Sequence, residues 1–168
     1  MGAVKIIVLG EEGEAKSRFM EQASKNYLKA DPDHKIGVDL YVNSVTFDYR
    51  QYYLQFYVLD LEERFRFMWP GYMEGATAGI VIYDAGRPES IWKMDSWLSL
   101  LRENLGSAPI ALIGLKSTAE EDAAVEEAVI TAKMQEYYIT DSFLVAPTTR
   151  KNAEAVIEQF ARKLLGLG

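Results

Sequence analysis

The sequence predicts an α/β fold of three layers, in which a sheet of about six mostly parallel strands lies between helices on both faces. Two observations predict it. Short apolar segments alternate along the chain with longer amphipathic segments, which is typical of a parallel sheet covered by helices. The chain has 168 residues, of which 49% are hydrophobic and 26% charged, and neither repeats nor linkers divide it. We therefore expect one domain that spans residues 1–168.

The first half of the chain predicts a strand, a helix and a hairpin, in that order. Residues 3–9 are a continuous apolar run, as in a buried strand. Residues 17–29 form the expected first helix, which an Asp-Pro-Asp segment ends. Residues 38–47 alternate apolar and polar side chains, and residues 52–59 are rich in strand formers. Because only a short turn separates these two runs, we expect them to pair antiparallel.

The second half repeats the alternation of strand and helix. One expected helix carries Ile91, Met94, Leu98 and Leu101 on one face at helical spacing. Strands are expected at residues 77–83, 109–114 and 142–146, and helices at about 88–104, 119–136 and 152–165. Ligands of such sheets bind beyond the carboxyl ends of the strands, so the segments that follow the strands are expected to line any site.

Composition excludes several classes of function. The net charge of −7 disfavours a nucleic-acid partner, because binding to a phosphate backbone needs clustered Lys and Arg. With no Cys and a single His, the chain has neither a disulfide framework nor the usual ligands of zinc. No apolar run approaches the roughly 20 residues that cross a bilayer. We also find no signal peptide and no terminal Cys for a lipid anchor, so we expect a cytoplasmic protein without a membrane anchor.

The residues after the first strand match a phosphate-binding loop in outline. The pattern of such loops is G-x-x-x-x-G-K-[ST], placed between a strand and a helix. Gly10, Lys16 and Ser17 match that pattern, whereas Ala15 replaces its second glycine. An ordinary helix start, with Ser17 as the cap and Lys16 in solvent, would explain the same residues. The loop taken by itself therefore does not establish a nucleotide site.

Three glutamates, Glu11, Glu12 and Glu14, stand in this loop where phosphate oxygens would be held. Two unit charges about 4 Å apart repel by roughly 4 kcal/mol at an effective dielectric of 20. Lys16 and the helix N-terminus would offset only part of that repulsion. The simpler interpretation is a solvated acidic loop that disfavours phosphate without binding anything itself. A metal site that combines these glutamates with Asp60 is the alternative.

Several segments share their order and spacing with one known family. They are Ile36-Gly-Val-Asp-Leu40, Glu63-Arg-Phe-Arg66, Pro70-Gly-Tyr-Met-Glu-Gly-Ala76, Ile80-Val-Ile-Tyr-Asp84 followed by Pro88-Glu-Ser-Ile, and Ala161-Arg-Lys-Leu-Leu165. With the loop at residue 10 and the hairpin, they resemble the Ras/Rab-like small GTPases over nearly the whole chain. The resemblance implies the P-loop small-GTPase-like fold. It also implies that any GTP or GDP, with Mg²⁺, would contact Gly10, Gly13, Lys16, Ser17 and Lys116.

The hydrolytic motif of that family is altered here. The family has Asp-x-x-Gly followed by Gln, and the corresponding places hold Val58, Leu61 and Glu62. A shift of two residues makes Asp60 the acid, but Glu63 then takes the place of the glycine. Either alignment loses the glycine that contacts the terminal phosphate in the family. We therefore expect no catalytic residue.

The other nucleotide contacts implied by the resemblance are altered as well. Lys35 stands where the family has a threonine for magnesium, and residues 115–118 read Leu-Lys-Ser-Thr in place of Asn-Lys-x-Asp. Residues 146–148 read Ala-Pro-Thr in place of Ser-Ala-Lys. These changes favour a pseudo-GTPase with weak or no GTP binding and hydrolysis, which needs no cofactor and acts by protein–protein interaction.

Two other functions fit parts of the sequence. The first is a genuine guanine-nucleotide switch with slow or no hydrolysis, which would use the loop residues that remain. The second is a phosphoacceptor receiver domain, in which Asp60 would be phosphorylated. The hairpin at residues 38–59 and the length of the chain argue against the receiver domain.

Aromatic side chains predict where a protein partner binds. Large apolar residues crowd residues 65–72, a segment expected at the surface. By resemblance, Leu40, Tyr57 and Tyr72 match an apolar triad on which Rab-like proteins dock their effectors, and we add Trp69 as an anchor. Burial of these side chains in the core is the competing interpretation, because alternation along a strand places about half of them inward. We expect a partner surface within residues 38–75.

Overall fold

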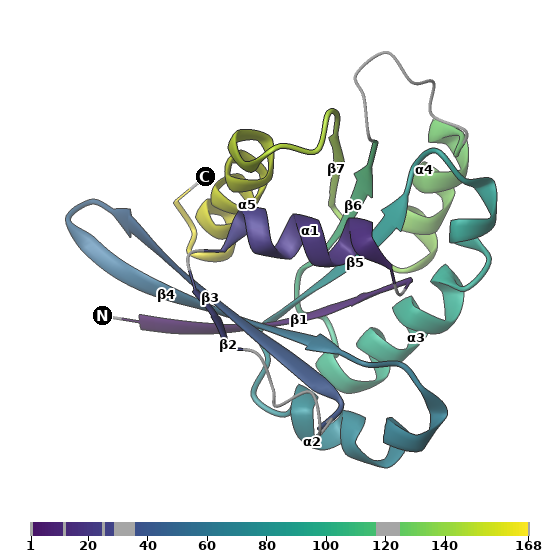
Figure 1. The fold of residues 1–168 in the computed structure, drawn as a ribbon, viewed down its shortest axis with the longest axis horizontal. Coiled ribbons are helices and arrows are strands. Elements are labelled where there is room, and N and C mark those ends of the chain that lie inside the picture. The colour runs from purple at the N-terminus through teal and green to yellow at the C-terminus, as the bar shows by residue number, and fades with distance from the viewer. Residues whose placement is uncertain (1, 12, 25, 29–35, 117–124, 168) are drawn as a thin grey trace.

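The computed structural model describes residues 2–11, 13–24, 26–28, 36–116 and 125–167, with the backbone alone for 26–28 (Figure 1). Within these residues a single sheet of seven strands has the order β2-β3-β4-β1-β5-β6-β7. The strands are β1 Gly2–Gly10, β2 Asn26–Leu28, β3 Val38–Phe47, β4 Arg50–Leu59, β5 Ala78–Asp84, β6 Ile110–Leu115 and β7 Asp141–Val145. The β2–β3 and β3–β4 pairs are antiparallel and the remaining pairs are parallel. The predicted α/β fold, with its mostly parallel sheet, is confirmed.

The hairpin of β3 and β4 forms with the predicted pairing. Its register runs from Val38 opposite Leu59 to Phe47 opposite Arg50. Asp48 and Tyr49 make the turn, with φ of 49° and 65°. Positive φ at both central residues is the geometry that matches the twist of a hairpin, although Asn-Gly is the usual pair there. The hairpin extends well beyond the helices that cover the sheet (Figure 1).

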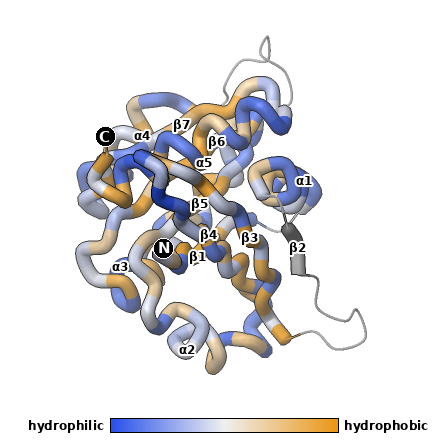
Figure 2. The backbone as a smooth tube through the Cα atoms, turned by 90° about the vertical axis from the view of Figure 1, so that its left-hand side faces the viewer, coloured by the Kyte–Doolittle hydropathy of each residue, from blue (hydrophilic) through white to orange (hydrophobic). Residues whose placement is uncertain are grey.

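The helices form two layers. α1 (Glu14–Ala23) and α5 (Arg150–Leu164) cover one face, where a core cluster includes Phe19 and Phe160. The other face is covered by a 3-10 helix η1 (Glu63–Met68), α2 (Trp69–Met73), α3 (Met94–Leu105) and α4 (Glu127–Glu136). The tube in Figure 2 shows hydrophobic strands between more polar helices. The three predicted layers are therefore present.

The boundary of the first helix differs from the prediction. α1 ends at Ala23 rather than at residue 29, and β2 follows it. The amide of Asn43, which is buried on β3, donates to the carbonyl oxygen of Ala23 at 2.9 Å. This contact satisfies a carbonyl at the helix end, and the chain then turns to pair with β3. A tertiary contact thus ends the helix where the local sequence does not.

Two other predicted helices are shorter than expected. The segment predicted at 88–104 is divided into a 3-10 helix η2 (Pro88–Ile91) and α3, which begins at Met94. Of the helix predicted at 119–136, α4 accounts for residues 127–136, and residues 117–124 lie outside the described part of the chain. α5 begins as an ordinary capped helix, because the side chain of Thr149 accepts a hydrogen bond from the Asn152 amide.

Candidate functional site

The described residues of the loop after β1 share three features with a phosphate-binding loop. A Cβ atom added at Gly10 would lie 2.5 Å from the carbonyl oxygen of Ile82, so only glycine fits there. Gly13 caps the N-terminus of α1. Lys16 folds back over the loop, where its Nζ donates to the Gly10 carbonyl at 3.2 Å and its side chain is 4% exposed. The alternative of a solvated Lys16 at an ordinary helix start is therefore wrong.

A cavity of about 230 Å³ opens beside this loop, at the carboxyl ends of β1, β5 and β6. Glu11, Glu14 and Asp84 bring three carboxylates to its lining, against the two cations of Lys16 and Arg87. The lining therefore carries a net negative charge, which fits a triphosphate poorly. Asp84 and Arg87 were not singled out in the sequence. The signal for them was their position directly after a central strand.

Lys116 lies next to this cavity, which its neighbour Leu115 lines. Its side chain is buried, and its backbone joins β6 to the segment after β7. The Lys116 amide donates to Val145, and the Lys116 carbonyl accepts from the amide and the hydroxyl of Thr148. The structure thus brings together the two segments that the resemblance assigns to the base. The altered positions 117 and 118 lie outside the described residues.

Ser17 lies at a second, smaller cavity of about 50 Å³, on the magnesium side of the family's site. Asp39, Val58 and Asp60 line it together with Ser17. The carboxylate of Asp60 already accepts from the Glu62 amide at 2.9 Å. No group of three metal-ligating side chains is found among the residues that the structure describes. Asp39 was missed in the sequence, and only its pairing opposite Val58 reveals it.

These carboxylates do not complete the site that the family uses for Mg²⁺. Val58, at the place of the family's acid, is 7% exposed and supplies no oxygen. Asp60 lies beyond the end of β4, with its amide bonded to the carbonyl of Gly37 at 2.9 Å. Residues 12 and 35, which the sequence also singles out here, are not described. The residues present therefore fit a nucleotide in backbone shape but not in charge or metal ligands.

The predicted apolar triad is brought together on the opposite side of β4. Leu40 and Tyr57 are direct cross-strand partners, and Tyr72 packs with them on the core cluster beneath α2 and α3. All three side chains are partly buried. The Tyr72 hydroxyl donates to the Ile36 carbonyl at 2.5 Å.

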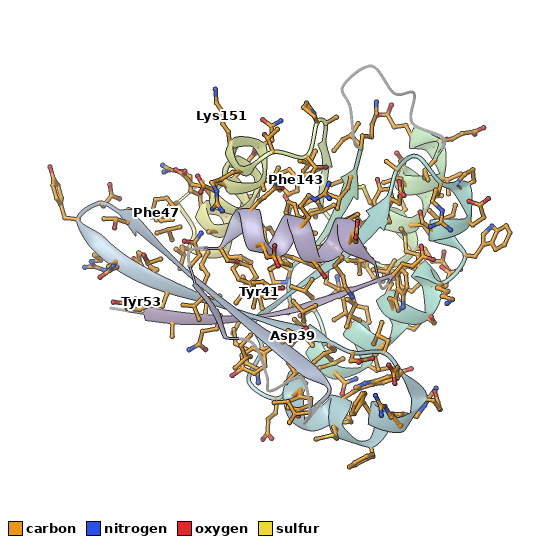
Figure 3. All side chains as sticks on the ribbon, viewed as in Figure 1. Asp39, Tyr41, Phe47, Tyr53, Phe143 and Lys151 are labelled. Carbon is orange, nitrogen blue, oxygen red and sulfur yellow. The ribbon has the colours of Figure 1, made fainter. Side chains whose placement is uncertain are left out.

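Lys5 adds a cation to this surface. Its Nζ lies 4.3 Å from the centre of the Tyr57 ring and donates to the Glu74 carbonyl at 2.7 Å. Desolvation by burial lowers the pKa of Lys5, while the charge of Glu74 opposes that shift. Tyr41 and Phe47, which Figure 3 labels on β3, belong to the core cluster on the side of α1 and α5.

The expectation that Trp69 is an exposed anchor was wrong. Its side chain is 6% exposed and its Nε1 donates to the Asp60 carbonyl at 3.0 Å. Phe65 is also buried, because its ring lies against the bare Cα of Gly37. Phe65 on η1 and Trp69 at the start of α2 both point inward, and Phe67 is left 80% exposed. Of the four aromatic side chains in residues 65–72, two are thus in the core, Tyr72 is partly buried and Phe67 is exposed.

The strand, loop and buried lysine, set in a mostly parallel sheet with a leading hairpin, define a P-loop domain of the small-GTPase type. A sequence model of the Ras family matches residues 5–166, so the chain belongs to the Ras family. The receiver-domain alternative is therefore wrong. In the described part of the chain, no helix is both long enough and apolar enough to cross a membrane.

Individual relatives come from the Rab and Ypt proteins. The chain is 26% identical over 156 residues to the Ras-related protein RABA1c of Arabidopsis thaliana, a match that covers 91% of this chain and 72% of that protein. It is 26% identical over 152 residues to the Ras-related protein YPT3 of Nicotiana plumbaginifolia, covering 89% and 70%. A shorter match, 32% identical over 98 residues, is to the Ras-related protein Rab-18 of Lymnaea stagnalis and covers 58% and 48%.

Proposed function

We propose that this Ras-family protein is a pseudo-GTPase, which acts by binding a protein partner through the Leu40–Tyr57–Tyr72 surface. The observation that carries the proposal is the altered nucleotide site beside an intact triad. Carboxylates predominate where a triphosphate would lie, and Val58 takes the place of the acid on the metal side.

The electrostatic argument depends on the sum of charges in the larger cavity. Three carboxylates and two cations line it before any ligand enters. A triphosphate would add several negative charges, and the residues that would hold the balancing Mg²⁺ in the family are altered here. Lys16 could still pair with one phosphate, but Ala15 adds a methyl group directly before it in a loop where the family has glycine. Binding of GTP is therefore expected to be weak and hydrolysis absent.

The partner surface has the composition of a protein interface. Tyrosine is enriched at the energetic centres of such interfaces, and two of the three triad residues are tyrosines. Leu40 and Tyr57 are held by the rigid β3–β4 pair, and Tyr72 is held by its bond to Ile36. A surface built on fixed elements loses little side-chain freedom when a partner docks.

The alternative is a genuine guanine-nucleotide switch that hydrolyses GTP slowly or not at all. The observation that supports it is the loop itself, where only glycine fits at position 10 and Lys16 folds back to the Gly10 carbonyl. In that case Gly13, Ser17 and Lys116 would contribute the remaining contacts, with GTP or GDP and Mg²⁺ as ligands.

Nucleotide content separates the two functions. The purified protein is denatured and the released small molecules are separated by chromatography. In a second experiment, fluorescently labelled GDP is titrated into native protein with Mg²⁺. The proposal expects no stoichiometric nucleotide and no saturation at micromolar concentrations. Stoichiometric GDP or GTP, or a sub-micromolar Kd, would establish the alternative.

A further inference from the structure

A further cavity adjoins the nucleotide loop, because Gly10 and Glu11 belong to its lining, and it shares no residue with the triad. It measures about 730 Å³ and opens between η1, the start of α2 and the length of α3. Its apolar lining consists of Leu61, Trp69, Trp97 and Leu100. Volumes of this size are typical of sites that bind a ligand. We call it the α3 groove.

The α3 groove follows a helix face. Lys93, Trp97, Leu100 and Glu103 recur at the spacing of one face of α3 and its preceding turn. Ten residues separate the first from the last, which corresponds to about 15 Å of helix at a rise of 1.5 Å per residue. An elongated groove of this length, walled by helices, matches a partner helix better than a compact small molecule.

The uncharged part of the lining is mainly apolar, and Ser96 and Ser99 are its hydroxyl-bearing members. Trp69 and Trp97 are each 6% exposed, so only an edge of each indole reaches the groove. The indole N–H of Trp69 is already bound to the Asp60 carbonyl. An occupant therefore needs apolar side chains at the centre of its contact.

The rim of the groove is acidic. Four carboxylates line it, from Glu11, Glu62, Glu63 and Glu103, against the two cations Arg66 and Lys93, which leaves a net charge of −2. Glu63 and Arg66 pair with each other at 2.5 Å, and Glu62 pairs with Arg64 at 2.7 Å. Glu11, in the loop after β1, and Glu103, on α3, form no ion pair with another described residue.

We propose that the α3 groove docks an amphipathic helix of a partner protein, whose apolar face is flanked by Lys or Arg. The apolar residues would contact Leu61, Trp97 and Leu100, and the flanking cations would face Glu11 and Glu103. The net charge of −7 on the whole chain favours the same basic partner. The groove shares no residue with the Leu40–Tyr57–Tyr72 surface, so this proposal does not depend on the proposed function.

Selection from a displayed library of helical peptides, about 18 residues or 27 Å long, tests the proposal on the whole chain. The library keeps one apolar face and randomises the flanking positions. We expect the recovered peptides to carry Lys or Arg beside that face, and a labelled copy of one to bind more weakly as salt is raised. Recovery of no peptide, or of peptides with neutral or acidic flanks, would overturn the proposal.

Two variants locate the binding. Ser96→Trp fills the groove from an exposed position on α3, and Glu103→Lys reverses the charge of its rim. Each should lower the affinity for the labelled peptide by at least about tenfold. Glu158→Lys, an equal charge change on the exposed side of α5, and Tyr57→Ala should leave it unchanged. Circular dichroism checks that Ser96→Trp folds, and Glu103→Lys decides the matter if it does not. Loss of binding in Tyr57→Ala alone, or unchanged binding in Glu103→Lys, would contradict the groove as the site.

Discussion

Asp39 on β3 pairs in register with Val58 on β4, and both line the small cavity beside Ser17. An apolar side chain thus lies between two acidic ones, because Asp60 lines the same cavity. A third carboxylate at position 58 would add like-charge repulsion that a bound cation could offset. The effect of a charge at position 58 can therefore be tested by substitution.

Val58→Asp should destabilise the protein by about 1–3 kcal/mol, because it buries a carboxylate beside Asp39 and Asp60. Added Mg²⁺ should raise the Tm of this variant more than that of the parent, since a cation would now have three carboxylates near it. Val58→Asn, which has the same shape without the charge, is the control and should show no response to Mg²⁺. Thermal unfolding with EDTA and with MgCl₂ measures both effects. Equal Tm values for the two variants in EDTA would count against the charge argument.

Removing one loop carboxylate and restoring a glycine should improve phosphate binding. The double variant Glu11→Ala/Ala15→Gly lowers the negative charge of the 230 Å³ cavity beside the loop and restores the family's glycine. We expect its affinity for GTP to rise by at least about tenfold, equivalent to about 1.4 kcal/mol. Glu158→Ala removes one charge from α5 and serves as the control. Isothermal titration with GTP and Mg²⁺ gives the comparison, and an unchanged affinity would show that these side chains do not limit binding.

Gly10 should tolerate no side chain. Gly10→Ala places a methyl group 2.5 Å from the Ile82 carbonyl oxygen, which belongs to the central strand β5 and cannot easily move. The cost of such overpacking is about 1–3 kcal/mol. Gly71→Ala is the control, because nothing lies within 4 Å of its added Cβ. Urea unfolding should show a lower midpoint for the first variant only, and equal midpoints would contradict the backbone contact.

Tyr83 should make the stability depend on pH in the alkaline range. Burial raises the pKa of Tyr83 to about 12, above its ordinary value of 10.0. The folded state therefore favours the neutral phenol, and its stabilising contribution is complete below pH 10 and is lost as the pH rises towards 12. The loss is at most about 2–3 kcal/mol. Tyr83→Phe should flatten this part of the pH profile of unfolding, and a slope that remains unchanged would assign it to other groups.

The triad should bind the partner as a unit. Tyr57→Ala and Leu40→Ala each remove one side chain of a cross-strand pair, and the rest of the surface is unchanged. Proteins captured from cell extract and quantified by mass spectrometry should decrease by at least about tenfold with both variants. Tyr49→Ala is the control, because Tyr49 is fully exposed at the hairpin turn. A partner that both triad variants retain would dock elsewhere on the molecule.

Periodicity predicted the layers, the sheet and the hairpin, because these depend on alternation that is visible along the chain. The loop at Gly10 was also recognisable, and the structure adds that Lys16 folds back over it. The end of α1 was not predictable, since a hydrogen bond from Asn43 on a distant strand helps to set it. The burial of Trp69 was not predicted for a similar reason, because the fold brings the Asp60 carbonyl to its indole N–H. Asp39 and the α3 groove depend on residues from separate elements, which no local pattern reveals.

The bond from Tyr72 to Ile36 joins α2 to the segment that precedes β3, and the amide of Asp60 bonds to Gly37 beside it. These two hydrogen bonds connect α2 and the end of β4 to the segment before β3, so protein atoms alone hold the elements that carry the triad. Under the proposed function, a partner that docks on the triad would therefore meet a preformed surface and would need no small molecule to assemble it. The fraction of the protein bound to its partner would then depend on the concentrations of the two proteins and not on the rate of GTP hydrolysis.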